Sequence, residues 1–288
     1  MGDTRPLPQP SAAQGVRSKR DTSDTRDAQG TRGQRARAGR WRRVRKRAAL
    51  AAVAVLAVLV LAVGALWLAT PSASQAAELA RAQAIGHGIA YPGPPVPANF
   101  ARPLIATEDK RFYTEPGIDP LAVGRVIAAE VSNGSDQGGA TIEQQLAKML
   151  YTPGRTGFDA ELTQVVLAVK LNASYPKQQI LALYAEVAYY GNGYYGLEQA
   201  SCGYFGHPAR DLTVTQGAML AGVVNAPSVD DPVTNPGNAR ARLQHVIARM
   251  VAVGYLTTAQ ARQALAAPLG LTPDRLTRDG LAQGGGDC

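Results

Sequence analysis

Two polar clusters, at residues 108–113 and 137–148, carry side chains that a packed core does not need. The first holds the paired acids Glu108 and Asp109 and the aromatic Phe112. The second combines glycines with amides and ends in a lysine. Together they supply a carboxylate that can exchange a proton, a glycine turn, and polar donors near a cation. Such a set is suited to chemistry on a sugar that carries a phosphate.

The second cluster has helical spacing. Thr141, Gln145 and Lys148 stand at i, i+4 and i+7, so one helix face would present them together, with Gln144 beside them. Thr141-x-x-Gln144, directly after a Gly-Gly pair, predicts a capping box that opens this helix. Taken alone, an amide-rich helix face is more often a solvated surface, so the interpretation rests on the combination of clusters.

The rest of the outer region is also predicted to be helical. Strand signals are few, no internal repeat is present, and the fold class is therefore mainly α. Leu162, Val165, Val166 and Val169 form an amphipathic pattern, and Thr257-x-x-Gln260 opens a last short helix. The other predicted helices cover residues 121–131, 177–187, 197–205, 213–224 and 238–253.

One apolar run is long enough to cross a membrane. Ala48 to Ala69 contains 22 residues without a charge, and at 1.5 Å per residue it spans a hydrocarbon core of about 30 Å. We expect a transmembrane helix at 48–70. Five Lys or Arg residues lie just before it, which predicts a cytoplasmic N-terminus and an extracytoplasmic domain. A cleaved signal peptide ending near 72–77 is the rival interpretation, although the leader would be long.

Charge is distributed unevenly along the chain. The formal net charge is +8, but residues 1–47 hold fourteen Lys or Arg and four Asp, which leaves 16 basic and 18 acidic residues for the rest. We expect 1–47 to be a disordered basic cytoplasmic tail. A nearly neutral domain gives no support for nucleic-acid binding. The expected order continues with a linker at 71–96, a domain at 97–266 and a flexible C-terminal tail at 267–288.

Cysteines and histidines give no further site. Cys202 and Cys288 do not indicate a disulfide framework, and three widely separated histidines show no metal-ligand spacing. We therefore assign no metal ligands.

A series of motifs follows a recognisable order between about Pro97 and Ala266. The segments are Glu108…Phe112…Gly117-Ile118-Asp119-Pro120, Gly138-Gly139-Ala140-Thr141-Ile142-x-Gln144-Gln145-x-x-Lys148, Tyr175-Pro176-Lys177-x-x-Ile180-Leu181, Tyr190-Gly191-x-Gly193-x-Tyr195-Gly196 and Asn235-Pro236…Ala239…Arg242…Val246. This series resembles the bacterial peptidoglycan glycosyltransferases, glycosyltransferase family 51. No penicillin-binding transpeptidase domain follows in the sequence, so the layout resembles the monofunctional type.

The resemblance implies a lysozyme-like glycosyltransferase fold with a membrane-facing groove, in an enzyme of the bacterial cell membrane that polymerises lipid II. In that family the position of Glu108 is a general base on the acceptor GlcNAc 4-hydroxyl. The hydroxyl oxygen attacks C1 of the donor MurNAc with inversion, and undecaprenyl diphosphate leaves. By position, Lys148 would contact the diphosphate and Gln144 and Gln145 the donor. The resemblance places the other substrate-binding positions at Asp109, Phe112, Thr141, Gln164 and Lys177.

Several positions depart from the family's pattern. Where the third motif has Arg-Lys and then Glu, this chain has Ala160, Glu161 and Gln164. Glu115 and Glu143 replace a histidine and a threonine. Losing two cations beside a diphosphate and gaining acids should weaken donor binding. Arg155 or a divalent cation such as Mg²⁺ or Mn²⁺ could compensate.

Two hypotheses follow, and both have lipid II, a nascent glycan strand and the membrane as partners. The first is an active peptidoglycan glycosyltransferase that uses Glu108. The second is a weak or inactive lipid II or glycan-binding scaffold that assembles with cell-wall synthesis or division proteins. A glycan-cleaving enzyme with Glu108 as acid is a minor third interpretation.

Overall fold

The computed structural model describes residues 24–119, 140–272 and Cys288. The chain divides after Ala65 into two units, and each is described by itself. The helix expected at 121–131 and the Gly138-Gly139 turn lie outside the described residues.

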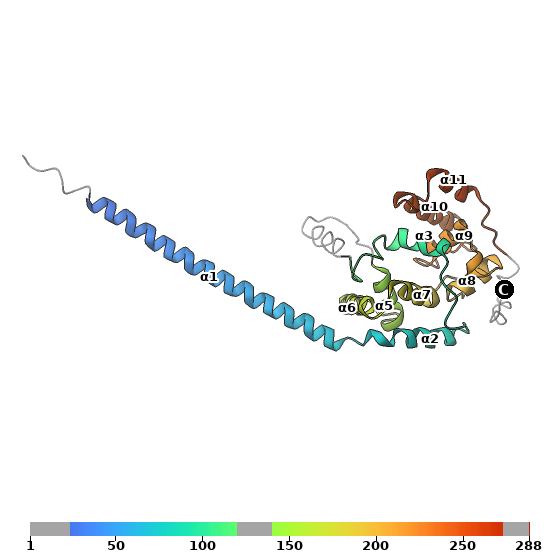
Figure 1. Cartoon of the computed structure of the whole chain (residues 1–288), viewed down its shortest axis with the longest axis horizontal. Helices are drawn as coiled ribbons and strands as arrows, with labels where there is room; N and C mark the ends of the chain where they lie inside the picture. Colours follow the sequence, from blue (N-terminus) through green and yellow to red (C-terminus); the bar gives the residue numbers. More distant parts are fainter. Residues whose placement is uncertain (1–23, 120–139, 273–287) are drawn as a thin grey trace, which may run out of the picture. The chain divides into compact units, whose positions relative to one another are not determined.

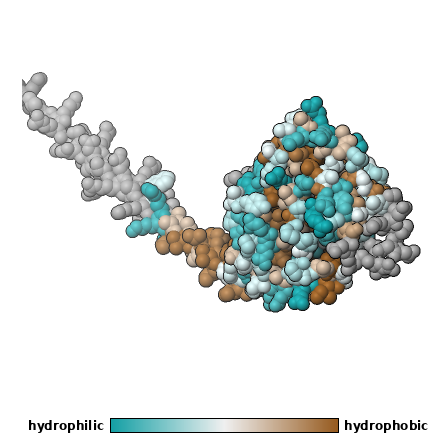
Figure 2. All heavy atoms as spheres, turned by 45° about the vertical axis from the view of Figure 1, so that its right-hand side comes forward, coloured by the Kyte–Doolittle hydropathy of each residue, from teal (hydrophilic) through white to brown (hydrophobic). Residues whose placement is uncertain are grey.

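The first long element is helix α1, Asp24–Ala69. Its apolar portion, 48–69, leaves large side chains such as Leu50, Val58 and Leu68 exposed. Figure 2 shows a continuous hydrophobic stretch along this helix. By length and composition, this is the one helix of the described chain that could cross a membrane. Residues 24–47, which were expected to belong to a disordered tail, are helical in the structure, because α1 begins at Asp24.

The second unit is built from helices, as predicted. They are η1 (Ala73–Gln75), α2 (Ala76–Gly86), α3 (Ala98–Glu108), α5 (Ile142–Tyr151), α6 (Phe158–Ser174), α7 (Lys177–Val187), α8 (Leu197–Phe205), η2 (Ala209–Asp211), α9 (Val214–Val223), α10 (Pro236–Ala252) and α11 (Thr258–Ala266). Helices α5, α6 and α7 pack together, and α3 packs on α9 and α10 (Figure 1). Within the described ranges the only strand-like pairing is an isolated bridge between Tyr189 and Tyr195.

Residues 71–96 do not form the expected linker. Ala76, Ala80 and Ala84 recur every fourth residue on α2 and are buried, and α2 packs against α7 and α5. Small side chains let this helix approach its neighbours closely, but they give a weak hydrophobic signal in the sequence. The folded domain therefore begins before Pro97.

The C-terminal boundary also differs from the expected one. Leu269 and Leu271 pack on the core, and the backbone N–H of Thr272 donates to the carbonyl of Tyr204 at 2.9 Å. Cys202 on α8 and Cys288 are joined by a disulfide, a pairing that the sequence analysis did not predict. Residues 267–272 thus belong to the domain, and the disulfide fixes the last residue of the chain to α8.

Local signals predicted the helices well. The capping boxes at Thr141–Gln144 and Thr257–Gln260 are both confirmed, and each Thr cap stabilises its helix by about 1 kcal/mol.

The predicted apolar face of α6 is only partly correct. Of the predicted residues, Val166 is buried and Leu162 is 37% exposed, and the buried side of the helix also includes Leu167 and Leu171, which were not predicted. The polar and apolar side chains at 161, 164 and 165 instead line a cleft.

Candidate functional site

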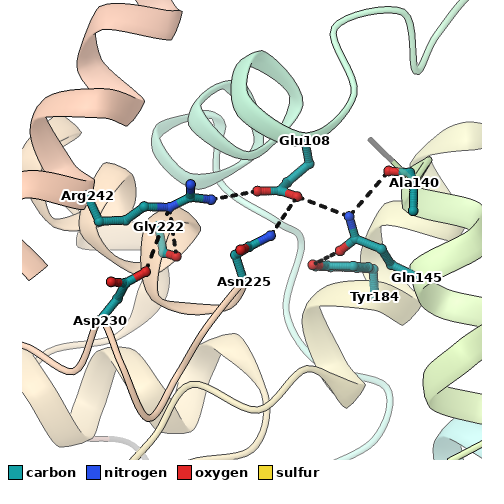
Figure 3. A network of polar contacts seen from close by, with 8 residues as sticks. All are labelled: Glu108, Ala140, Gln145, Tyr184, Gly222, Asn225, Asp230 and Arg242. Carbon is teal, nitrogen blue, oxygen red and sulfur yellow. Dashed lines mark hydrogen bonds and ion pairs between the residues drawn. The ribbon is translucent and has the colours of Figure 1, made fainter. Parts of the chain in front are cut away.

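Glu108 is the last residue of α3, where the helix opens onto a cleft. Its side chain is 9% exposed and three donors hold it (Figure 3). Gln145 Nε2 and Asn225 Nδ2 each lie 3.1 Å from Oε2. Arg242 Nη2 lies 2.9 Å from Oε1. An ionised carboxylate has about four lone-pair sites, so about one remains for a further proton donor.

Gln145 is fixed from both ends of its amide. Its Nε2 donates to Glu108, and its Oε1 accepts from the hydroxyl of Tyr184 on α7 at 2.9 Å. Burial, and then the charge of Glu108, raise the pKa of Tyr184 well above its ordinary value. The phenol therefore stays protonated and donates, which sets the orientation of the amide.

Arg242 reaches Glu108 from α10, across 134 residues of sequence. Its Nε donates to the carbonyl of Gly222 at 3.3 Å and lies 4.0 Å from Asp230 Oδ2 (Figure 3). The sequence interpretation placed Arg242 in a motif but gave it no role. A signal was present, because Arg242 is a charge on the helix face that also carries Ala239, Leu243 and Val246, all of which are buried.

The cleft around Glu108 has a volume of about 1140 Å³. It brings together five residues that the sequence assigned to the site, which are Glu108, Gln144, Gln145, Lys148 and Gln164. Lys148 is exposed, and its ammonium has no hydrogen-bond or ion-pair partner among the residues that the structure describes. Tyr189, Tyr195 and His87 add an aromatic wall, in which the His87 and Tyr195 rings stack 3.5 Å apart. A carboxylate, amides and aromatic faces suit a glycan.

A family model described as transglycosylase matches residues 87–251, more than half of the chain. The chain belongs to the transglycosylase family. The predicted resemblance to peptidoglycan glycosyltransferases is therefore confirmed, and with it the mainly helical, lysozyme-like transglycosylase fold.

Individual relatives agree with this family. The chain is 36% identical over 61% of its length to a Cupriavidus necator protein provisionally named a transglycosylase, of which it covers 76%. It is 36% identical to penicillin-binding protein 1F of Bacillus subtilis over 61% of this chain. It is 40% identical to penicillin-binding protein 1A of Neisseria gonorrhoeae over 56% of this chain. The chain spans only 25% and 20% of these two longer proteins.

Two of the three positions that depart from the family's third motif lie at this cleft, while Ala160 is buried. Glu161 and Gln164 both line it, and Gln164 Nε2 donates to Thr152 Oγ1 at 2.9 Å. Arg155 does not replace the missing cations, because it pairs with Asp159 at 2.7 Å on the exposed surface and is absent from the described lining. Among the described lining residues, Lys148 is the only Lys or Arg.

The described lining does not fit a divalent cation. Glu108 is held by Arg242 and Asp119 by Arg111, so Glu161 is the only other acid on this part of the cleft wall. A divalent cation such as Mg²⁺ needs several oxygen ligands in a tight shell. We therefore route no chemical step through a metal.

Four other residues assigned to substrate binding lie outside the cleft lining. Phe112 is fully buried in the core. Thr141 is the N-cap of α5 and donates to the carbonyl of Gly117 at 2.8 Å. Asp109 Oδ2 accepts from the backbone N–H of Ile142 at 3.2 Å. Lys177 pairs with buried Glu143. These residues make structural contacts next to the cleft, and their role in binding substrate stays a prediction.

Proposed function

We propose that this protein is a membrane-anchored peptidoglycan glycosyltransferase that polymerises lipid II into glycan strands. Glu108 accepts the proton of the acceptor GlcNAc 4-hydroxyl as its oxygen forms a bond to C1 of the donor MurNAc. The bond from C1 to the diphosphate oxygen breaks with inversion, and undecaprenyl diphosphate leaves with the electron pair. The observation that carries this proposal is the Glu108 carboxylate, fixed at the cleft wall with about one free acceptor site.

The neighbours of Glu108 fit the role of a positioned base. Gln145, Asn225 and Arg242 come from three different segments and hold both carboxylate oxygens. A base that is already oriented loses little entropy when the hydroxyl arrives, and this preorganisation is a large part of catalysis. The cleft volume of about 1140 Å³ lies slightly above the ordinary range for small-molecule sites and leaves room for an extended substrate.

Lys148 is our candidate for stabilising the leaving diphosphate. It stands two turns along α5 from the helix start, on the cleft side with Gln144 and Gln145. A cation close to the bridging oxygen would offset the negative charge that develops as the bond to C1 breaks.

We expect Lys148→Ala to weaken lipid II binding and to leave folding almost unchanged. The ammonium is exposed and has no described protein partner, so its loss should change stability by no more than about 0.5 kcal/mol. A binding titration with a short-chain lipid II analogue measures the effect. Lys110→Ala is the matched control, since Lys110 is exposed and absent from the described cleft lining. Equal affinity of both variants would remove Lys148 from the donor site.

The proposed location is the bacterial cell membrane, with one span, the N-terminus in the cytoplasm and the domain outside. The apolar part of α1 and the Arg/Lys group before it support this orientation. The disulfide between Cys202 and Cys288 also supports it, because disulfides persist in oxidising compartments.

An uncleaved anchor predicts that the intact chain stays in the membrane pellet after alkaline carbonate extraction. The reason is that burying this apolar run in lipid does not depend on peripheral ionic contacts. Immunoblotting of pellet and supernatant, with N-terminal sequencing of the mature chain, measures it. Release of the intact chain would contradict the anchor, and a mature N-terminus beyond Ser72 would show a signal peptide.

Polymerisation of labelled lipid II by the purified full chain tests the proposed activity. Glycan products that depend on Glu108 support it, and products at background level despite intact folding contradict it.

A second candidate is a scaffold that binds lipid II or a glycan strand with little turnover and assembles with cell-wall synthesis or division proteins. The acid Glu161 and the neutral Gln164 at the cleft favour it, since the described lining offers one cation for a diphosphate. Binding of the lipid II analogue together with background polymerisation would select this candidate over the enzyme.

A further inference from the structure

Three carboxyl groups meet where the end of α3 joins the start of α5. The oxygens of Asp109, Glu115 and Glu143 lie within 4.8 Å of one another, and all three residues are at least nine-tenths buried. Lys177 Nζ lies 2.5 Å from Glu143 Oε1. One ammonium group therefore lies beside three acidic side chains, and it forms its ion pair with Glu143.

Glu115 has no donor for its carboxylate. Neither of its oxygens has a hydrogen-bond partner among the described residues, and the same holds for Glu143 Oε2. An ionised carboxylate without a donor or counter-ion is very costly to bury. A proton on Glu115 removes this cost, because the neutral carboxyl group can donate its O–H to the Asp109 carboxylate.

Two of the three charged groups around Glu115 also favour its protonated form. Asp109 at the end of α3, Glu143 on α5 and Lys177 on α7 are the charged groups that face it. Burial raises the pKa of Glu115 to about 8, the neighbouring Asp109 carboxyl group and the charge of Glu143 add to the rise, and Lys177 opposes it. Near neutral pH the folded protein therefore keeps this proton.

Asp109 and Glu115 are linked through α5 to the proposed catalytic carboxylate. Asp109 follows Glu108 in the chain and accepts from the backbone N–H of Ile142, the first residue of α5. One turn further along α5, Gln145 holds Glu108 at 3.1 Å. The spacing between Glu108 and Gln145 therefore depends on how Asp109 joins the two helices.

We propose that Glu115 is a positioning residue whose carboxyl group shares a proton with Asp109 and so holds the junction of α3 and α5. Loss of the proton leaves two adjacent buried carboxylates, which repel each other and loosen the junction. The effect on activity rests on the proposed function, whereas the effect on stability and on carboxyl protonation does not.

The sign of the pH effect follows from the raised pKa. Between the ordinary value of 4.5 and about 8, the folded state keeps a proton that the unfolded state has lost. The stabilisation is complete below the lower value, falls as pH rises through this window, and is lost above the upper value. The unfolding equilibrium constant should rise by up to about tenfold per pH unit in this range.

Glu115→Gln provides the test, because an amide N–H can donate to Asp109 at every pH. Glu78→Gln is the matched control, since Glu78 is exposed on α2 and outside the described cleft lining. Infrared titration of the full chain should show a protonated carboxyl band at pH 7 in the wild type and in Glu78→Gln, with a midpoint near 8. Glu115→Gln should lack this band. Its stability should also lack the decrease that the wild type shows between pH 4.5 and about 8.

The activity measurement separates the two proposals. From pH 7 to pH 9, lipid II polymerisation by the wild type should fall about tenfold relative to Glu115→Gln, since only about a tenth of Glu115 stays protonated one unit above its pKa. If no variant polymerises lipid II, the proposed function fails, while the infrared and stability data still decide the role of Glu115.

Two results would overturn the role of Glu115. One is a wild-type carboxyl band that titrates near 4.5 or is unchanged in Glu115→Gln. The other is stabilisation of the wild type, but not of Glu115→Gln, by added Ca²⁺ or Mn²⁺, which would assign the cluster to a cation. If Glu115→Gln fails to fold, the infrared midpoint of the wild type alone decides between these outcomes.

Discussion

Replacing Glu108 with glutamine is expected to reduce lipid II polymerisation by about 10²- to 10⁴-fold, the usual range for loss of a general base. Glutamine keeps the size of the side chain and can still accept from Asn225 at its carbonyl oxygen. It cannot take the proton of the acceptor hydroxyl, and it loses the ion pair with Arg242. Product analysis with labelled lipid II measures the rate, and circular dichroism checks the fold.

The Glu78→Gln variant is the control for this comparison as well. It makes the same chemical change on the exposed face of α2, so its polymerisation rate should equal that of the wild type. Unchanged synthesis by Glu108→Gln would remove Glu108 from the mechanism. A fall in rate accompanied by unfolding would assign Glu108 a structural role through its three donors.

Replacing Gly217 with alanine should destabilise the domain by about 3 kcal/mol or more, near the top of the range for overpacking. Gly217 lies on α9 where that helix meets the start of α3. An added Cβ would lie 1.8 Å from the carbonyl oxygen of Asn99 and 2.5 Å from its carbonyl carbon. These are backbone atoms, so no change of rotamer can relieve the contact. Thermal unfolding of the full chain in detergent measures the loss.

Gly237→Ala is the matched control for this experiment. Gly237 lies near the start of α10, where an alanine Cβ would have no neighbouring atom within 4 Å and the backbone is ordinary helix. Alanine there should be neutral or stabilise the domain by up to about 1 kcal/mol. Equal stabilities of the two variants would show that α3 and α9 do not approach each other this closely.

Much of the fold could be predicted because helix signals are local. A capping box such as Thr141 with Gln144 satisfies backbone groups within four residues, so its sequence pattern is enough to place the helix start. Helices α7 and α8 also have the predicted bounds, because Pro176 precedes the first helix and Gly196 and Gly206 flank the second. The family motifs likewise identified Glu108 and the cleft-lining amides and lysine of α5.

The tertiary structure decided which of these side chains meet. Arg242 reaches Glu108 across 134 residues, and Cys202 pairs with Cys288 across 86 residues. No local pattern specifies such contacts, because they depend on how whole helices pack. The same packing buries Thr141 and brings Glu115 beside Asp109. Residue types and helical spacing thus determined the chemistry available to this protein. Helix packing determined which of these groups line the cleft and which are buried beside it.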